Sequence, residues 1–314
     1  MWLEKIKKSK RHIVCSISGG KDSTAMALWL IENEFHKTNT ISFVYADTGW
    51  EHPEVYEYLN KVIEPLLTQY GDFHYLRNEK YPNGMVDMIR KNQSFPTRIG
   101  RFCTKELKVQ PIKAFIKSLI SNGENPVNTV GIRAQESQRR SLMDEFDHGG
   151  PIGCDTWRPL INFVIEDVID IHARHNVVPC SLYYKKNNPV KRVGCWPCML
   201  SSKTEIKNFA EDDQGQLETI RNLEKEIGPL VQLKAKNRAE KNDTEFDPDN
   251  VVGSTFFCSS KKPYPYPVDE AIDWAKTARG GIQYELFTPQ NPSERGCQMW
   301  GLCDLPDEDG EFTA

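Results

Sequence analysis

The stretch HIVCSISGGKDSTAMALWL, from His12 to Leu30, decides the fold that we predict for this chain. Its first six residues form a short apolar run with β-branched members, which is typical of a buried strand. Ser18-Gly19-Gly20 interrupts the run, and Asp22, Ser23 and Thr24 suit the first turn of a helix that continues to Leu30. A helix that begins behind a glycine turn points free N–H groups and its positive dipole end at one spot, which suits phosphate.

The composition describes an ordinary globular chain. With 314 residues it can bury a substantial core as one large domain or two smaller ones. The net charge of −4 gives no overall nucleic-acid signal and leaves room for a local basic face. No apolar run has the length of a membrane span, and no signal-peptide core follows the basic N-terminus, so we expect a cytoplasmic protein. In a reducing compartment its nine cysteines indicate metal or redox chemistry rather than disulfides.

Strand-like and helix-like segments alternate over the first half of the chain. Strands are predicted at 12–17, 40–46, 73–76 and 128–132, and helices at 54–67, 85–90 and 104–121, where Pro111 marks a break or a fresh start. This alternation predicts an α/β fold, a parallel doubly wound sheet with helices on both faces. Three polar clusters follow predicted strands and should meet at the carboxyl edge of the sheet, where ligands bind: Ser18–Ser23, Asp47–Glu51 and Arg133–Arg140.

The second half is less regular. The pattern weakens from Ser137 to Trp157, where three glycines predict a mobile loop, and helices are predicted at 162–175, 217–239 and 268–278. We therefore expect a nucleotide-binding α/β domain over 1–205 and a mostly helical, loop-rich C-terminal extension over 206–314. The acidic stretch 304–314 is expected to be a disordered tail.

The glycine loop is not a Walker A motif. That motif needs a glycine at position 15 and a serine or threonine at position 22, where this chain has Cys15 and Asp22. The loop reads SGGKDS instead, over residues 18–23. Chemistry other than γ-phosphate transfer is therefore expected.

The SGGKDS loop resembles the SGGxDS loop of the PP-loop ATP pyrophosphatase superfamily, and other segments extend the resemblance in the order found in its phosphoadenosine-phosphosulfate reductase-like branch. The match covers residues 11–200 and is specific as a set, whereas each segment alone is weak. The resemblance implies the adenine nucleotide alpha-hydrolase-like fold. The matching segments are Tyr45–Gly49 with Glu51–Glu54, Arg101–Thr104 with Leu107, Lys108 and Pro111, Gly131–Arg133 with Glu136, Ser137, Arg139 and Arg140, Trp157–Tyr184, and Gly194–Cys198.

The resemblance implies that backbone N–H groups of the loop hold the phosphates of ATP, with contacts from Ser18, Gly19, Gly20 and Ser23. Lys21 would neutralise phosphate charge. Asp22 needs a cation before it can face phosphate, so it is a candidate Mg²⁺ ligand, and the alternative is that it caps the helix.

The other polar clusters supply further candidates for the nucleotide site. Asp47 and Thr48 end the second strand, where the base or ribose would lie, although an aspartate before Thr-Gly is also a common turn former. Arg133 and Arg139 are candidate clamps for phosphate or substrate, since guanidinium groups bind oxyanions bidentately. For an isolated arginine a solvated surface role is the alternative.

Four cysteines are predicted to hold a metal centre. Cys195 and Cys198 have the spacing of a thiolate pair, and Cys297 and Cys303 form a second pair near the end of the chain. A [4Fe–4S] cluster is favoured because the resemblance includes iron–sulfur members with a GCxxC element. A Cys₄ zinc site is the alternative, since spacing alone does not separate the two. Cys258 is a reserve ligand.

Cys103 is a candidate ligand or a free catalytic thiol. Cluster-bearing members of the branch have two adjacent cysteines here, whereas this chain has Thr104 in the second place. The cations Arg101, Lys105 and Lys108 predict a lowered thiol pKa and a sulfur-carrying role. Simple packing at a helix start is the alternative.

Three functions remain open at this stage. The first is an ATP-dependent sulfur-transfer enzyme, similar to the DndC-like proteins of DNA phosphorothioation, which would adenylate an acceptor, release pyrophosphate and insert sulfur, with a cysteine desulfurase as a sulfur-donating partner. The second is a sulfonucleotide reductase, although the chain lacks the ECGxH-like tail of those enzymes because GLCDL surrounds Cys303. The third is a nucleotide-binding cluster subunit without turnover.

Nucleic acid is a candidate acceptor because two basic stretches are present, one of them with aromatic residues for base stacking. Charge runs of this kind are also common on solvated faces. The first stretch contains Tyr183, Tyr184, Lys185, Lys186, Lys191 and Arg192, and the second contains Lys234, Lys236, Arg238 and Lys241.

Overall fold

The computed structural model describes residues 2–185, 188–258 and 265–277. Its main feature is a six-stranded sheet with the order β3-β2-β1-β4-β6-β5, in which only β5 is antiparallel to its neighbour. This is the predicted α/β fold with a mostly parallel sheet. The strands are β1 (His12–Ile17), β2 (Ile41–Ala46), β3 (Asp72–Leu76), β4 (Pro126–Val130), β5 (Phe146–Asp147) and β6 (Asp155–Trp157), and a separate hairpin pairs β7 (Phe257–Cys258) with β8 (Pro265–Tyr266).

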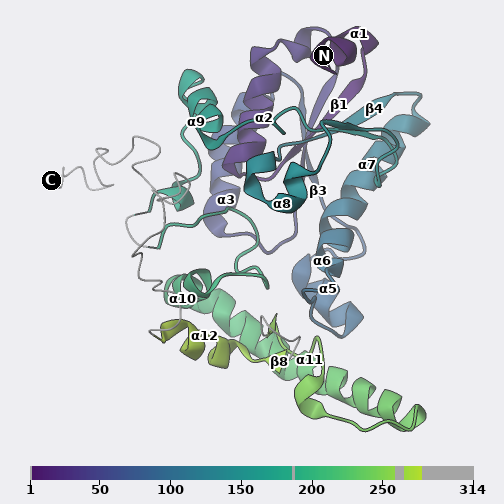
Figure 1. Cartoon of the computed structure of the whole chain (residues 1–314), viewed down its shortest axis with the longest axis vertical. Helices are drawn as coiled ribbons and strands as arrows, with labels where there is room; N and C mark the ends of the chain where they lie inside the picture. The colour runs from purple at the N-terminus through teal and green to yellow at the C-terminus, as the bar shows by residue number, and fades with distance from the viewer. Residues whose placement is uncertain (1, 186–187, 259–264, 278–314) are drawn as a thin grey trace, which may run out of the picture.

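Helices lie on both faces of the sheet (Figure 1). Side chains of β1 alternate between two cores, with Ile13, Cys15 and Ile17 in the larger core and Val14 in a smaller core beneath α7. The helices of this part of the chain are α1 (Trp2–Ser9), α2 (Lys21–Glu32), α3 (Pro53–Tyr58), α4 (Glu64–Leu67), α5 (Met85–Asn92), α6 (Phe102–Thr104), α7 (Gln110–Ser121), α8 (Gln138–Ser141) and α9 (Ile165–Arg174).

Two predicted helices begin or continue through a wider turn. A π-helical turn at Leu59–Ile63 joins α3 to α4, and another at Lys105–Val109 joins α6 to α7. Pro111 lies at the start of α7, directly after this π-helical turn. The backbone is helical on both sides of it, so the proline marks a change in the helical turn and not the break or fresh start that was predicted.

The segment 137–157 differs from the predicted mobile loop. Asp155–Trp157 pairs in parallel with β4, and Phe146 and Asp147 pair with it from the other side. Trp157 is fully buried. The prediction was wrong because glycines and polar residues hide two very short strands, whose apolar members are too few to produce a visible period.

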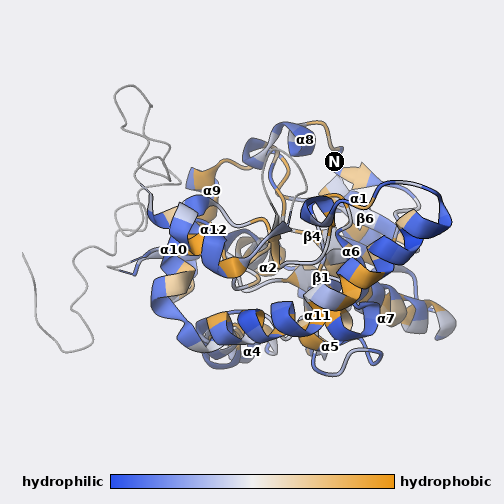
Figure 2. Cartoon of the chain, turned by 90° about the horizontal axis from the view of Figure 1, so that it is seen from below, coloured by the Kyte–Doolittle hydropathy of each residue, from blue (hydrophilic) through white to orange (hydrophobic). Residues whose placement is uncertain are grey.

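Three helices form the described C-terminal part: α10 (Lys203–Asp212), α11 (Gln214–Lys241) and α12 (Val268–Lys276). They lie together at one end of the sheet domain (Figure 1), and residues of α11 alternate between hydrophilic and hydrophobic along the helix (Figure 2). Its buried residues, among them Leu217, Ile220 and Leu223, belong to the same core cluster as the sheet. The domain boundary after residue 205 stays a prediction, and the tail 304–314 lies outside the described residues. No described helix is both long enough and apolar enough to span a membrane.

Candidate active site

The SGGKDS loop closes on the first turn of α2. The Ser18 N–H donates to Ser23 Oγ at 3.1 Å, and Ser23 Oγ donates to the Gly20 carbonyl at 2.9 Å. Gly19 has a φ of 71°, where an added Cβ would approach Val55 Cγ1 to 2.9 Å. These contacts fix the loop before any phosphate arrives, with the N-terminus of α2 behind it.

Arg133 crosses from the end of β4 to the loop. Its Nε donates to Asp22 Oδ1 at 2.6 Å, and its backbone N–H donates to Glu136 Oε2 at 2.9 Å. Gly131 permits this approach, because a Cβ there would lie 2.6 Å from the Asp22 carbonyl oxygen. Asp22 does not cap α2: the N-cap is Gly20, which makes no side-chain cap bond. The Asp22 carboxylate instead binds Arg133, with Lys21 Nζ 3.7 Å away.

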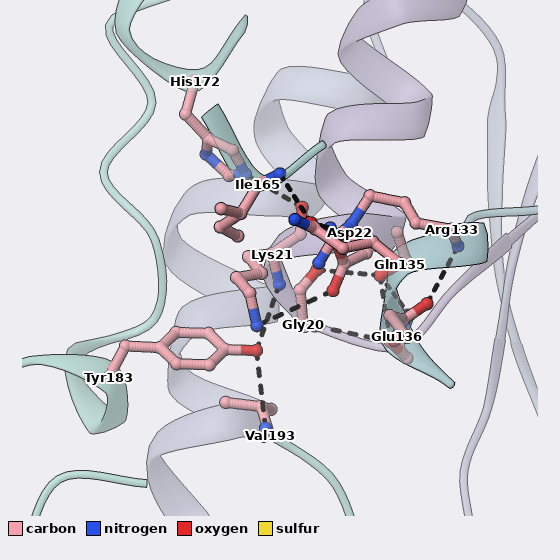
Figure 3. Close-up of polar contacts among 12 residues, drawn as sticks. Gly20, Lys21, Asp22, Arg133, Gln135, Glu136, Ile165, His172, Tyr183 and Val193 are labelled. Atoms are coloured by element: carbon pink, nitrogen blue, oxygen red, sulfur yellow. Dashed lines mark hydrogen bonds and ion pairs between the residues drawn. The ribbon is translucent and has the colours of Figure 1, made fainter. Parts of the chain in front are cut away.

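Lys21 is held from three sides (Figure 3). Its N–H donates to the Tyr183 hydroxyl at 3.2 Å, and its ammonium lies 4.8 Å from the centre of that ring. His172 Nε2 lies 3.0 Å from the Lys21 carbonyl oxygen. Burial lowers the pKa of Lys21, while Asp22 opposes the shift. Burial thus destabilises the charged form of Lys21, and an anion bound at the loop would stabilise that form again.

Tyr183 and His172 were not predicted as parts of this site. The buried Tyr183 hydroxyl also accepts from the Val193 N–H at 3.4 Å, so it joins the loop to the segment that leads to Cys195. The predicted base-stacking role of Tyr183 was wrong, since its ring lies in the core. Separations of 162 residues from Lys21 to Tyr183 and 151 to His172 give the sequence no local signal for either contact.

A cavity of about 510 Å³ opens over the loop. The structure places five cations in its lining, of which Arg140 forms an ion pair with Glu136. Arg139, the second predicted clamp, is exposed and does not line the cavity. Lys191 and Arg192 line this wall, and Lys185 pairs with Glu54, while the predicted nucleic-acid role of this basic stretch stays a prediction. The five cations are Lys21, Arg133, Arg140, Lys191 and Arg192.

Asp47 and Thr48 take part in the turn after β2. Asp47 Oδ1 accepts from the Gly49 N–H at 2.8 Å and from the Tyr56 hydroxyl at 2.9 Å, and Oδ2 binds Arg77. Thr48 Oγ1 donates to Glu51 Oε1 at 2.6 Å. These are the bonds of a turn-forming aspartate, and neither side chain lines the cavity over the loop. A nucleotide-binding role for both stays a prediction.

The GCxxC segment lies against this turn. Glu51 and Cys195 form an isolated antiparallel bridge, and the Trp196 N–H donates to the Trp50 carbonyl at 2.7 Å. Trp50 Nε1 donates in turn to the Pro197 carbonyl at 3.0 Å. These bonds place the thiol pair at the carboxyl edge of the sheet, two residues beyond Val193 of the loop cavity.

Cys103 comes within electrostatic range of both thiols of the pair, and all three have a raised pKa. Burial is the largest cause in each, and for Cys103 the charge of Cys195 adds to it. The predicted lowered pKa of Cys103 was therefore wrong: Arg101 acts weakly there, and Lys108 lies beside Cys195 and Glu51 instead.

Lys108 and Glu51 add a charged pair beside the thiols. Lys108 Nζ lies 4.0 Å from Glu51 Oε1, and the Glu51 side chain is 3% exposed. The negative charge of Cys195 is the main cause of a raised pKa at Lys108. A buried carboxylate and a lysine therefore set the electrostatics around Cys195.

The described residues alone do not form a metal centre. Within the described ranges no group of three or more His, Cys, Asp or Glu side chains is placed to hold an ion. The donor types fit a thiolate centre, since metal binding deprotonates buried thiols outright. Two of the four predicted ligands, Cys297 and Cys303, lie outside the described residues, as does the side chain of Cys258.

The sheet, the SGGKDS loop and the cation-lined cavity define a PP-loop nucleotide-binding protein. The sequence profile of the phosphoadenosine phosphosulfate reductase domain matches residues 12–201, which is more than half of the chain. The chain therefore belongs to the phosphoadenosine phosphosulfate reductase domain family.

Relatives occur in phages and in an archaeon. A 37.8 kDa protein from the gpa 5′ region of Escherichia phage 186 is 26% identical over 93% of this chain and 96% of its own length. The nin region protein ORF290 of Escherichia phage lambda is 30% identical over 40% of this chain and 49% of its own length. Protein MJ0066 of Methanocaldococcus jannaschii is 32% identical over 65% of this chain and 40% of its own length.

Two solved structures show a distant likeness. A phosphoadenylyl-sulfate reductase from Candida auris, in a phosphate complex, is 16% identical, with a TM-score of 0.44 over 62% of this chain and 94% of that one. The U34-tRNA thiolase NcsA from Methanococcus maripaludis, with its [4Fe–4S] cluster, is 15% identical, with a TM-score of 0.41 over 67% of this chain and 71% of that one. At these scores neither neighbour assigns a role to a residue here.

Proposed function

We propose that the protein is an ATP-dependent sulfur-transfer enzyme that activates an acceptor by adenylation and then replaces the activated oxygen with sulfur. One observation carries the proposal. The segment from Val193 to Cys198 lines the loop cavity at one end and presents two thiols at the other. Phosphate chemistry and sulfur chemistry would thus share one cleft, which membership in a sulfonucleotide-handling family supports.

The first half-reaction is attack by an acceptor oxygen on the α-phosphorus of ATP, with pyrophosphate as the leaving group. The loop N–H groups and the N-terminus of α2 would hold the departing phosphates, with Lys21 neutralising their charge. Arg133 keeps Asp22 from repelling them, because the ion pair already satisfies that carboxylate. A Mg²⁺ ion is proposed to accompany ATP, and Asp22 would become its ligand only by releasing Arg133.

The second half-reaction is displacement of AMP by sulfur. A hydrosulfide forms the new bond as the bond to AMP breaks. Where the sulfur arrives instead as a persulfide from a partner such as a cysteine desulfurase, its outer sulfur displaces AMP and a second thiol then cleaves the remaining S–S bond, which releases the thiolated acceptor and leaves a disulfide. Cys103, Cys195 and Cys198 lie within electrostatic range of one another, and we propose that the sulfur is delivered there. We propose that Cys195 and Cys198, with Cys297 and Cys303, hold a [4Fe–4S] cluster, or zinc as the alternative. When bound, a cluster would supply an iron site able to carry sulfide only if one of the four thiolates is not a ligand, and with all four bound the sulfur would be carried by Cys103 instead.

The finer proposal is that the acceptor is a nucleic acid, as in the DndC-like proteins of DNA phosphorothioation. Five cations line the loop cavity, and the basic residues Lys234, Lys236 and Arg238 are exposed on α11. Cations of this kind attract a phosphodiester backbone. The negative charge of the acceptor backbone would then draw the acceptor toward these cations.

The test is an assay of pyrophosphate and AMP release from ATP, with anaerobically purified protein, sulfide and candidate DNA or RNA acceptors. We expect acceptor-dependent release of both products, and its loss in Lys21→Met. The exposed Lys117→Met, on α7 and outside both basic stretches and the cavity, serves as the matched control and should retain activity. ATP binding without pyrophosphate release from every acceptor would favour the cluster-subunit alternative.

Sulfonucleotide reduction is the second candidate, and the family match favours it. In its assay, adenosine or phosphoadenosine phosphosulfate would yield sulfite when thioredoxin is present. Sulfite formation at a rate that exceeds ATP cleavage would replace sulfur transfer as the assigned reaction. We expect none, because Cys303 stands in GLCDL and not in an ECGxH-like motif.

A further inference from the structure

Arg192 lies on the chain between the loop cavity and the Cys195–Cys198 pair. It lines the cavity over the loop, it precedes Val193, whose N–H is bound by Tyr183, and it lies three residues before Cys195. Its side chain is exposed. The backbone around it is therefore fixed while its guanidinium remains accessible to a ligand.

The charges around Arg192 leave room for an anion. Among the described residues, its guanidinium meets the like charge of Lys108 and no carboxylate pairs with it. Glu51, the acid beside Lys108, is already bonded to Thr48 and Tyr56. Glu51 still balances the charge of Lys108, whereas Arg192 has no such carboxylate among the described residues. An oxyanion beside Arg192 would supply the missing counter-charge.

The cations around the loop already have partners of their own. Asp22 binds Arg133, and Glu136 binds Arg140. Arg192 lines the same cavity, has no carboxylate partner among the described residues and lies on the chain between the loop cavity and Cys195. Its charge is therefore available to a second tetrahedral oxyanion on the thiol side of the loop.

We propose that Arg192 is a positioning residue that binds a second oxyanion of the substrate, a phosphate or sulfate ester, between the loop cavity and Cys195. This inference rests on the proposed function in one respect, that the loop cavity takes the phosphate of a nucleotide. The shared chemistry is a tetrahedral oxyanion, and it has two possible sources. It is either the sulfate of a sulfonucleotide or the phosphodiester of a nucleic-acid acceptor.

The experiment measures equilibrium binding to the full chain by calorimetry, for wild type, Arg192→Gln and Arg192→Lys. The probes are AMP, adenosine 5′-phosphosulfate, and a 12-mer single-stranded DNA in the presence of ATP. Lys105→Gln is the matched control, because Lys105 is an exposed cation near Cys103 that does not line the loop cavity.

We expect Arg192→Gln to weaken one of the two larger ligands by about tenfold or more, as for loss of a charge-assisted hydrogen bond. AMP binding should stay within about twofold, and Arg192→Lys should recover part of the loss. Selective loss of phosphosulfate assigns the oxyanion to a sulfonucleotide, and selective loss of DNA assigns it to a phosphodiester. Urea midpoints should agree among the variants, which a merely structural role would not allow.

Two results would overturn the inference. Equal losses for AMP and the larger ligands would make Arg192 part of the loop cavity alone. Failure of wild type to bind either larger ligand, or a loss below about twofold for both, would remove the second oxyanion. The binding experiment does not depend on turnover. Absence of pyrophosphate release would therefore contradict the proposed function without changing the conclusion about Arg192.

Discussion

Two regions of the molecule differ in how their charges are balanced. The phosphate end is the SGGKDS loop with its cavity, and the thiol end is Cys103 with the Cys195–Cys198 pair. At the phosphate end the buried guanidinium of Arg133 and the carboxylate of Asp22 satisfy each other, and the loop is closed by its own hydrogen bonds. At the thiol end three half-buried thiols have raised pKa values. The ion pair of the phosphate end is thus formed in the folded chain, whereas the thiol end would gain stability from the metal centre that we propose there.

The largest effect is expected at the thiol end. Cys195→Ser or Cys198→Ser should lower bound iron, or zinc, at least tenfold after anaerobic purification, because loss of one thiolate removes a metal–sulfur bond. Iron, sulfide and zinc analysis measures it. Cys154→Ala is the control, since that buried cysteine lies in the separate core beneath α7.

Metal retained in both serine variants would show that the GCxxC pair is not the ligand pair. Stoichiometric zinc without iron would remove the cluster and leave the zinc alternative. With either result, the GCxxC pair would not hold an iron–sulfur cluster.

The next effect is expected at the ion pair of the phosphate end. Arg133→Ala should lower the free energy of unfolding by about 3 kcal/mol, because it leaves the Asp22 carboxylate with Lys21 alone. Urea denaturation measures it. Arg139→Ala, an exposed neighbour outside the cavity, should change stability by no more than about 0.5 kcal/mol. Equal costs for the two variants would contradict the assignment of Arg133 as the inward arginine.

A smaller effect should appear where the two ends are joined. Tyr183→Phe removes the hydroxyl that accepts from Lys21 and Val193, at a cost of about 1–3 kcal/mol. We expect weaker ATP binding together with faster alkylation of Cys195, measured by calorimetry and mass spectrometry. Tyr184→Phe is the control, being partly buried beside it. A change at one end alone would show that Tyr183 does not couple them.

The smallest effect is a pH dependence from the phosphate end. Burial lowers the pKa of His172 below its ordinary value of 6.5, so below pH 6.5 the unfolded chain binds a proton more readily than the folded one. Stability present above pH 6.5 should therefore fall as the pH is lowered through that range. His172→Gln should show a flatter profile in urea titrations between pH 7 and 5. Parallel profiles would exclude His172 as the source.

The part of the site that a contiguous stretch encodes could be predicted from the sequence. The strand, loop and helix of 12–30 follow from local apolar runs and a glycine turn, and the structure has them as β1 and α2. Arg133 was predicted beside the loop because carboxyl ends of parallel strands share an edge. Its pairing with Asp22 was not, since no pattern reports which side chains meet.

The rest depends on burial and on distant contacts. The pKa of Cys103 was predicted from neighbouring cations in the sequence, but desolvation outweighs them in the fold. Which of Arg139 and Arg140 lines the cavity depends likewise on the direction of α8, a helix of one turn, and the structure has Arg140 there. The contacts of Tyr183 and His172 with Lys21 could not be predicted from the sequence, because they join residues more than 150 positions apart.

The two bonds to Lys21 also bear on the order in which the chain is made. A ribosome releases the SGGKDS loop early, but the hydroxyl and imidazole that hold it are synthesised 162 and 151 residues later. Because domains fold largely as units once their partners have emerged, the Lys21 backbone reaches its folded contacts only after residue 183 is available. A chain that ended before that tyrosine would keep the internal hydrogen bonds of the loop and would lack the Tyr183 hydroxyl that joins Lys21 to Val193.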